Sequence, residues 1–229
     1  MILGVHVTRQ LWIQLRLLGL LTLPALASIA GVIVEGQSGP AAGRLTLAVG
    51  FAVAAVLSAV LVGTGFAEEI RSGAAGWLVV RAVPRTALIG AWLVVPVVAT
   101  LLAYVLAGIL AGLAIPPASQ VPDPLTIAVS VLAAAAPAIP LSAAALAIGV
   151  DAPGRVTALA VVIAGALLAV PLVMLGQAVV HPASGYWLVA GLTPGDRPIT
   201  VGLEAIGLCL AMAALLWFLA SRRFIRRDL

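Results

Sequence analysis

The acidic pair Glu68-Glu69 is the first candidate for chemistry, because it is the only place in the sequence where two carboxylates are adjacent. Carboxylates together with histidine are the residue types that activate water for hydrolysis. The two histidines of the chain are His6 and His181, and the topology set out below places them on opposite faces of a membrane. A general acid and a general base do not meet in that arrangement. We therefore expect no catalytic residues and no enzyme activity in this chain.

The residue types that the sequence lacks exclude further chemistry. All 12 basic residues are arginine, so the chain has no lysine for a phosphate-binding Gly-x-x-x-x-Gly-Lys loop or for a Schiff base. Work driven by ATP would need a second polypeptide that binds the nucleotide. The one cysteine, Cys209, lies in an apolar run without a second ligand nearby, so we expect no metal site and no cofactor in this chain.

Composition sets the fold class. The chain has 229 residues, of which 63% are hydrophobic and only 9% are charged. The apolar runs are continuous over about twenty residues, which is the length of a membrane-crossing helix, whereas strands of a membrane barrel alternate apolar and polar residues. The sequence predicts an all-α polytopic membrane protein with a single transmembrane domain over residues 1–229. Its first partner is the lipid bilayer, and nothing in the sequence supports binding of nucleic acid.

Six apolar runs predict six transmembrane helices, since each run is long enough to cross the hydrocarbon layer. Clusters of turn-forming glycine, proline and polar residues separate the runs. The predicted spans are residues 17–34, 45–66, 87–114, 125–150, 156–180 and 199–219.

The two ends of the chain flank these spans. Residues 1–16 place apolar and polar side chains on different sides of a helical wheel, which predicts an interfacial helix along the inner leaflet. The alternative is that these residues are an irregular start of the first span. Residues 220–229 form a basic tail after the last span.

Proline and glycine inside the spans predict details of helix packing. Pro137 and Pro140 in span four and Pro171 in span five each remove a backbone donor, so we expect kinks or breaks at these positions. Gly108 and Gly112 are four residues apart in span three. Small residues at this spacing predict that a neighbouring helix packs closely there.

The distribution of arginine predicts the orientation in the membrane. With six spans, one side of the membrane holds every arginine except Arg44 and Arg197. Basic residues near the ends of spans stay in the cytoplasm, so both termini are expected to be cytoplasmic in the plasma membrane. No charged residue lies near the midpoint of a predicted span, which argues against an ion-coupled transporter.

Residues 67–86 gather charge, glycine and proline between two apolar runs, and we expect them to form a cytoplasmic segment that contacts a partner. Glu68 and Glu69 can accept hydrogen bonds, or pair with Arg71 or with an arginine of the partner. Trp77 and the apolar residues after it can present a face to a groove. The alternative is a solvated loop whose apolar residues only anchor it to the membrane.

This segment resembles the transmembrane subunits of ABC-2 type exporters. In that family a cytoplasmic stretch after span two reads roughly Glu-x-x-x-Gly-Thr, followed by an apolar helical turn and Pro-Val-Ser-Arg. Here Glu69, Gly73, residues 82–85 (Ala-Val-Pro-Arg) and Gly90 are similar in type and spacing, whereas Ala74 stands in place of the threonine. The basic end of the chain is also similar to the end of such subunits.

The resemblance implies a permease subunit of an exporter with six spans and both termini inside. It implies a short coupling helix between spans two and three, on which an ATPase subunit that binds ATP and Mg²⁺ would dock. A second permease protomer, identical or paralogous, would complete the transporter. The predicted coupling residues are Glu68, Glu69, Arg71, Gly73, Trp77, Arg81 and Arg85.

An alternative interpretation of the same residues assigns the chain to a different class of protein. The chain would then be a structural or accessory membrane subunit that anchors a cytoplasmic protein without transporting anything. The two readings differ in whether an ATPase with Walker motifs accompanies the chain.

Overall fold

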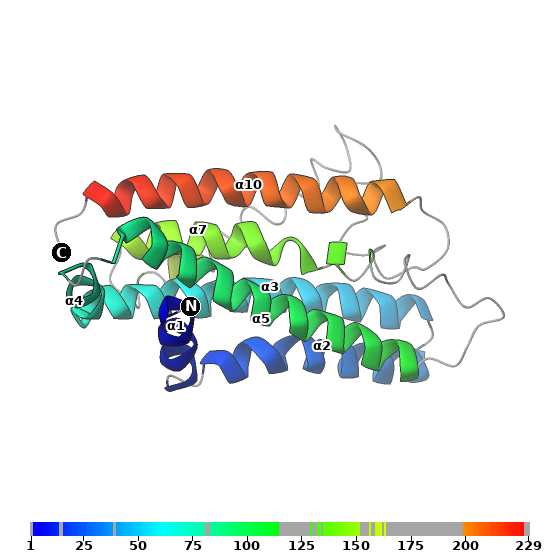
Figure 1. Ribbon diagram of the computed structural model, residues 1–229. Coiled ribbons are helices and arrows are strands. Elements are labelled where there is room, and N and C mark those ends of the chain that lie inside the picture. The colour runs from blue at the N-terminus through cyan, green and yellow to red at the C-terminus, as the bar shows by residue number, and fades with distance from the viewer. Residues whose placement is uncertain are drawn as a thin grey trace.

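The computed structural model describes a bundle of helices (Figure 1). It describes residues 2–13, 16–38, 40–80, 83–114, 129, 132–133, 135–151, 156, 159–161, 163 and 199–226. The elements are α1 (Ile2–Ile13), α2 (Arg16–Ser38), α3 (Pro40–Arg71), α4 (Ala74–Val80), α5 (Arg85–Ala114), α7 (Ala138–Asp151) and α10 (Ile199–Arg226).

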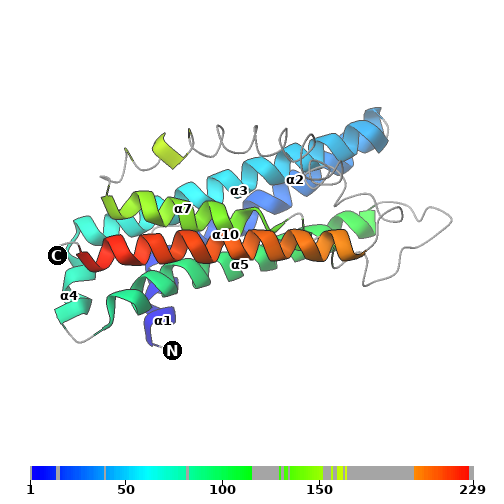
Figure 2. The same ribbon diagram turned by 90° about the horizontal axis from the view of Figure 1, so that it is seen from above.

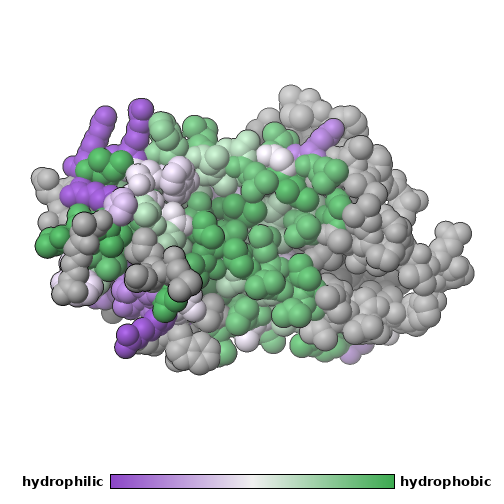
Figure 3. Space-filling model, in the orientation of Figure 1, coloured by the Kyte–Doolittle hydropathy of each residue, from purple (hydrophilic) through white to green (hydrophobic). Residues whose placement is uncertain are grey.

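Four of these helices are long and apolar enough to cross a membrane. A helix pairs most of its backbone N–H and C=O groups within itself, which is the condition for a segment that enters hydrocarbon, and its apolar side chains can face the lipid. Apolar side chains cover the middle of the molecule, and hydrophilic ones gather at the end that holds α4 (Figure 3). The protein is therefore a multi-pass membrane protein that contacts the lipid bilayer, and all the elements within the described residues are helices. The candidate spans are Leu18–Ser38, Val53–Arg71, Arg85–Ala107 and Ile206–Arg226.

Each long helix packs against at least two of the others. α2 packs on α3, α3 on α7, and α7 on α10, while α5 lies against α2 and also contacts α10 and α7 (Figures 1 and 2). The short helix α1 runs across the direction of the long helices and contacts α2 and α5. Most of the expected fifth span and the first part of the fourth lie outside the described residues.

The boundaries of α3 and α10 differ from the sequence expectation. We expected span two to end at residue 66 and a separate segment to start at residue 67, but α3 continues to Arg71. Residues such as Glu and Arg favour helix, and the helix ends only where Gly73 takes a positive φ of 78°. In the same way α10 continues to Arg226, so the described part of the basic tail is the last two turns of a helix.

The predicted proline and glycine positions fall as follows. A turn at Ala136 and Pro137 precedes α7, and Pro140 lies in the first turn of that helix, where a missing backbone donor is tolerated. Pro171 lies outside the described residues. Gly108 and Gly112 lie within α5, in a part of the helix whose side-chain surroundings are not described.

A close helix crossing lies between α3 and α7 instead. A Cβ atom added to Gly63 would lie 2.8 Å from the carbonyl oxygen of Ala145, and one added to Gly149 would lie 2.8 Å from the carbonyl oxygen of Gly63. These distances are too short for any side chain, so the two backbones touch directly. Glycine at such a crossing lets two helices pack at the shortest distance.

Candidate functional site

Glu69 is the centre of the candidate site, at the end of α3. Its side chain is almost fully buried, and each carboxylate oxygen accepts a hydrogen bond. Oε1 lies 2.8 Å from Nε2 of His6 on α1, and Oε2 lies 2.9 Å from Nε1 of Trp92 on α5. A carboxylate removed from water requires such partners, because burial without them costs several kcal/mol. One side chain thereby joins three helices.

The sequence of α3 makes room for this arrangement. Gly65 precedes Glu69 by four residues, which places the two on the same face of the helix. A Cβ atom at Gly65 would lie 2.8 Å from Cζ3 of Trp92, so the indole ring can occupy its position only because residue 65 has no side chain. The indole N–H then donates to Glu69, one turn further along α3.

An aromatic cluster lies beside this carboxylate and extends the contact to α10. The ring of Phe66 is 6.0 Å from that of Trp92, at an interplanar angle of 55°, and 5.4 Å from that of Phe224, at 62°. Tilted and edge-to-face pairs of this kind are favourable beyond the area they bury. All three residues are fully buried, so the ends of α3, α5 and α10 form one packed unit.

Arg16 ties the start of α2 to the same region of α3. Its guanidinium donates to the carbonyl oxygen of Leu61 at 2.8 Å and to the hydroxyl of Thr64. The Thr64 hydroxyl donates its own proton to the carbonyl oxygen of Val60, at 2.7 Å, so its oxygen is free to accept the bond from Arg16. Desolvation lowers the pKa of Arg16 from its ordinary value, and the nearby charge of Glu68 opposes this effect. The guanidinium remains a cation at neutral pH.

Arg85 binds the end of α10. It is the first residue of α5, and its guanidinium donates to the carbonyl oxygens of Phe224 at 3.3 Å and Ile225 at 2.7 Å. The last carbonyls of a helix have no partner within the helix and carry partial negative charge, so a cation there is stabilising. Arg85 therefore acts as a C-terminal cap supplied by a neighbouring helix.

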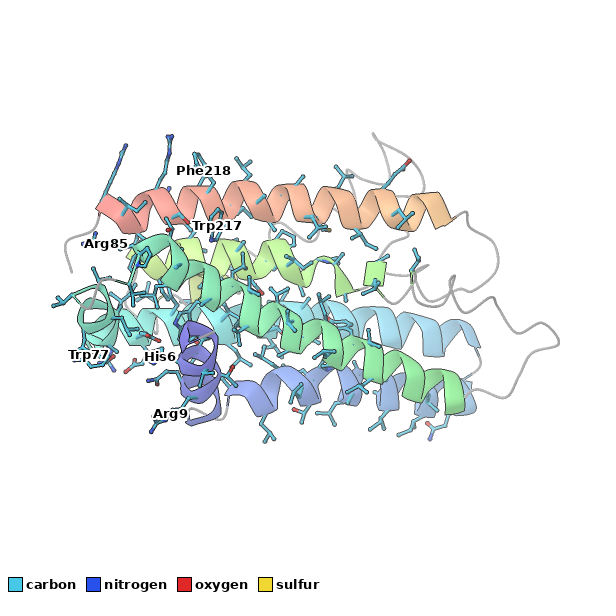
Figure 4. All side chains as sticks on the ribbon, viewed as in Figure 1. His6, Arg9, Trp77, Arg85, Trp217 and Phe218 are labelled. Carbon is cyan, nitrogen blue, oxygen red and sulfur yellow. The ribbon has the colours of Figure 1, made fainter. Side chains whose placement is uncertain are left out.

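The elements around Glu69 differ in exposure. Glu68 pairs with Arg71 on the surface of α3 at 2.6 Å. On α4, Ala75 and Leu78 are buried, whereas the side chains of Trp77 and Val80 are 56% and 87% exposed. Trp77 lies on α4 at the same end of the molecule as His6 and Arg85 (Figure 4).

The structure sorts the residues predicted to couple to a partner into several groups. Trp77 is on the exposed side of α4, and Gly73 forms the turn that leads into that helix. Glu69 makes the buried contacts described above, and the half-buried Arg85 donates to the end of α10, so each of the two binds within the chain. Glu68 and Arg71 pair with each other on the surface. Arg81 lies outside the described residues.

Four residues whose side chains make polar contacts in this site were not predicted from the sequence: His6, Arg16, Thr64 and Trp92. Their contacts span 23 to 63 residues of sequence, apart from the local bond of Thr64 to α3. The sequence does place a histidine in the N-terminal segment and a glycine four residues before Glu69, but no local pattern pairs either of them with its partner. The described residues include no group of three or more His, Cys, Asp or Glu side chains that could hold a metal ion. The hydrogen bonds of this site join different helices to one another.

Comparison with protein-family models and with curated proteins finds no match for this chain. The fold and site together define a multi-pass membrane protein in which a buried carboxylate joins three helices at one polar end.

Proposed function

We propose that the chain is the transmembrane permease subunit of an ATP-driven ABC-2 type exporter, energised by a separate nucleotide-binding subunit. The observation that carries this proposal is α4, a short helix between two candidate spans, which stands at the polar end of the bundle and exposes Val80. A soluble partner that binds a helix in that position can displace it by changing its own conformation. The resemblance of the stretch from Glu69 to Gly90 to that family supports the same reading.

The contacts around α4 can transmit such a displacement to α3 and α5. The turn at Gly73 joins α4 to α3, and a hydrogen bond from the backbone N–H of Val83 to the carbonyl oxygen of Leu78 holds the other end, at 3.3 Å. Trp92 and Glu69 tie α5 to α3. A displacement of α4 would therefore move both candidate spans as one unit, which is the rigid-body movement that alternating access requires.

The remaining parts of the proposal follow from the family reading. The chain would have six spans with both termini in the cytoplasm of the cell, and two permease protomers would pair. ATP and Mg²⁺ would bind to the partner, in agreement with the absence of lysine from this sequence. The permease itself would have no catalytic residue.

Purification of the tagged chain from its native membranes tests this proposal. The expected result is a stoichiometric partner with Walker motifs and ATPase activity in the purified complex. Recovery of the chain with no ATPase would overturn the permease assignment and favour an anchoring subunit.

A matched pair of variants tests the role of α4. Val80→Glu and Val5→Glu introduce the same charge at two exposed valines, on α4 and on α1. We expect Val80→Glu to lose the ATPase and Val5→Glu to retain it. If both variants kept the partner, α4 would not be the docking element.

A further inference from the structure

The last two turns of α10 carry three arginines that differ in their partners. Arg223 forms an ion pair with Asp151 of α7, with 3.1 Å between Nη1 and Oδ2. Arg222 and Arg226 are exposed, and in the described ranges no carboxylate lies within ion-pair distance of either. Two cations on this surface are thus left without an acidic partner among the described residues.

Arg222 and Arg226 continue a ridge of apolar residues along α10. The guanidinium of Arg222 lies over the ring of Phe218, with its carbon 4.5 Å from the ring centroid. Residues 218, 222 and 226 follow each other at intervals of four, so they occupy one side of the helix at levels about 6 Å apart. Phe218 faces away from the other helices, whereas Trp217 faces toward them (Figure 4).

This ridge crosses from the apolar to the charged part of the molecule. Leu215, Phe218 and Leu219 are 60%, 46% and 45% exposed, and the candidate span that contains them ends at Arg226. Hydrophilic side chains project from this end of α10, beyond the apolar band (Figure 3). Arginine at the end of a span extends toward the headgroups of the bilayer while its stem stays on apolar surface.

We propose that Arg222 and Arg226 bind the phosphate of an anionic phospholipid, whose acyl chain lies along Leu215, Phe218 and Leu219. Guanidinium groups recognise phosphate through charge-assisted hydrogen bonds. The apolar ridge directly below them selects an amphiphile over a soluble anion. Unneutralised positive charge on the protein selects an anionic headgroup over a zwitterionic one.

The C-terminal dipole of α10 does not prevent this binding. The carbonyl end of a helix repels an anion. In α10, however, the carbonyl oxygens of Phe224 and Ile225 already accept hydrogen bonds from Arg85. Arg222 and Arg226 are therefore not needed as caps and remain available to a ligand.

Lipid binding to the purified chain tests the proposal without any other subunit. The protein is delipidated in detergent and titrated with phosphatidylglycerol or with phosphatidylcholine of the same chain length, and bound lipid is counted by native mass spectrometry. We expect a preference of roughly tenfold for phosphatidylglycerol, since each arginine near a headgroup contributes to binding. The double variant Arg222→Gln, Arg226→Gln should reduce that preference to about one.

Matched variants and soluble anions complete the test. Arg9→Gln removes an exposed arginine from α1 and should leave the preference unchanged. The double variant Arg222→Lys, Arg226→Lys should retain most of the preference because the charge stays. Raising the salt concentration should weaken the preference of the unmodified protein, which gives a readout that needs no variant. An equal loss in Arg9→Gln, a salt-independent preference, or full competition by inorganic phosphate at the lipid concentration would overturn the proposal.

Discussion

The indole N–H of Trp92 donates to the carboxylate of Glu69 across 2.9 Å, and this one bond joins the start of α5 to the end of α3. The second oxygen of the same carboxylate is held by His6. Glu69 therefore has no free oxygen directed at the surface and acts as an internal connector. The outer surface near it belongs to Glu68 and to α4.

The two adjacent glutamates should respond differently to the same substitution. Glu69→Gln replaces one acceptor oxygen with an amide N–H₂, so the two charge-assisted hydrogen bonds of the buried carboxylate become neutral ones at best, at a cost of about 1–3 kcal/mol. Glu68→Gln only weakens a surface pair with Arg71, in which the glutamate side chain is 37% exposed. Unfolding of both variants in the same detergent measures the difference. Equal loss of stability in the two variants would contradict the assignment of Glu69 as a buried connector.

Alanine at the crossing of α3 and α7 should destabilise the protein. In Gly63→Ala and Gly149→Ala the new Cβ atom would meet a backbone oxygen at 2.8 Å, so the helices must separate, at a cost of about 1–3 kcal/mol. The control is Gly207→Ala on α10, where a Cβ atom meets nothing within 4 Å. Thermal unfolding should show the two crossing variants well below the control. A control that lost as much stability would show that the close approach is not the cause.

The turn between α3 and α4 should require a left-handed residue. Gly73 has a φ of 78° and open space around its Cα atom, so the strain of a substitution there comes from the backbone alone. Gly73→Ala should cost about 1–2 kcal/mol, and Gly73→Asn should cost less because asparagine enters this region more readily. The two variants are compared by unfolding in detergent. Identical stability of alanine and asparagine at this position would refute the left-handed turn.

Removal of the cap on α10 should loosen the end of that helix. Arg85→Gln takes away the cation that donates to Phe224 and Ile225, so the last turn should fray. Backbone amides of residues 222–226 should then exchange with deuterium roughly fivefold faster, which corresponds to about 1 kcal/mol of local stability.

The control for this cap is the neighbouring ion pair. Arg223→Gln breaks the exposed contact with Asp151 and should leave exchange in the last turn nearly unchanged. Faster exchange in Arg223→Gln than in Arg85→Gln would assign the stability of this helix end to the ion pair instead.

The amino-acid sequence by itself determined the all-helical membrane class and the approximate positions of several helices. The runs expected at residues 17–34, 87–114 and 199–219 correspond to α2, α5 and α10. These features are predictable because the free energy of transfer from water to hydrocarbon adds up over a continuous run of apolar residues, and because a helix satisfies its own backbone hydrogen bonds. The end of α3 at Arg71, just before the turn at Gly73, is likewise a local property, although the length of this helix was underestimated.

Only the tertiary structure decided what each polar residue does. Glu68 and Glu69 are neighbours in sequence, yet one pairs on the surface and the other is buried, because successive helical residues point about 100° apart and the packing of α1 and α5 covers only one of them. The partners of Glu69 lie 63 and 23 residues away, and the crossing of Gly63 with Gly149 joins positions even further apart. Local pattern sets which segments are helices, whereas the choice of neighbours depends on how all of them fill space together.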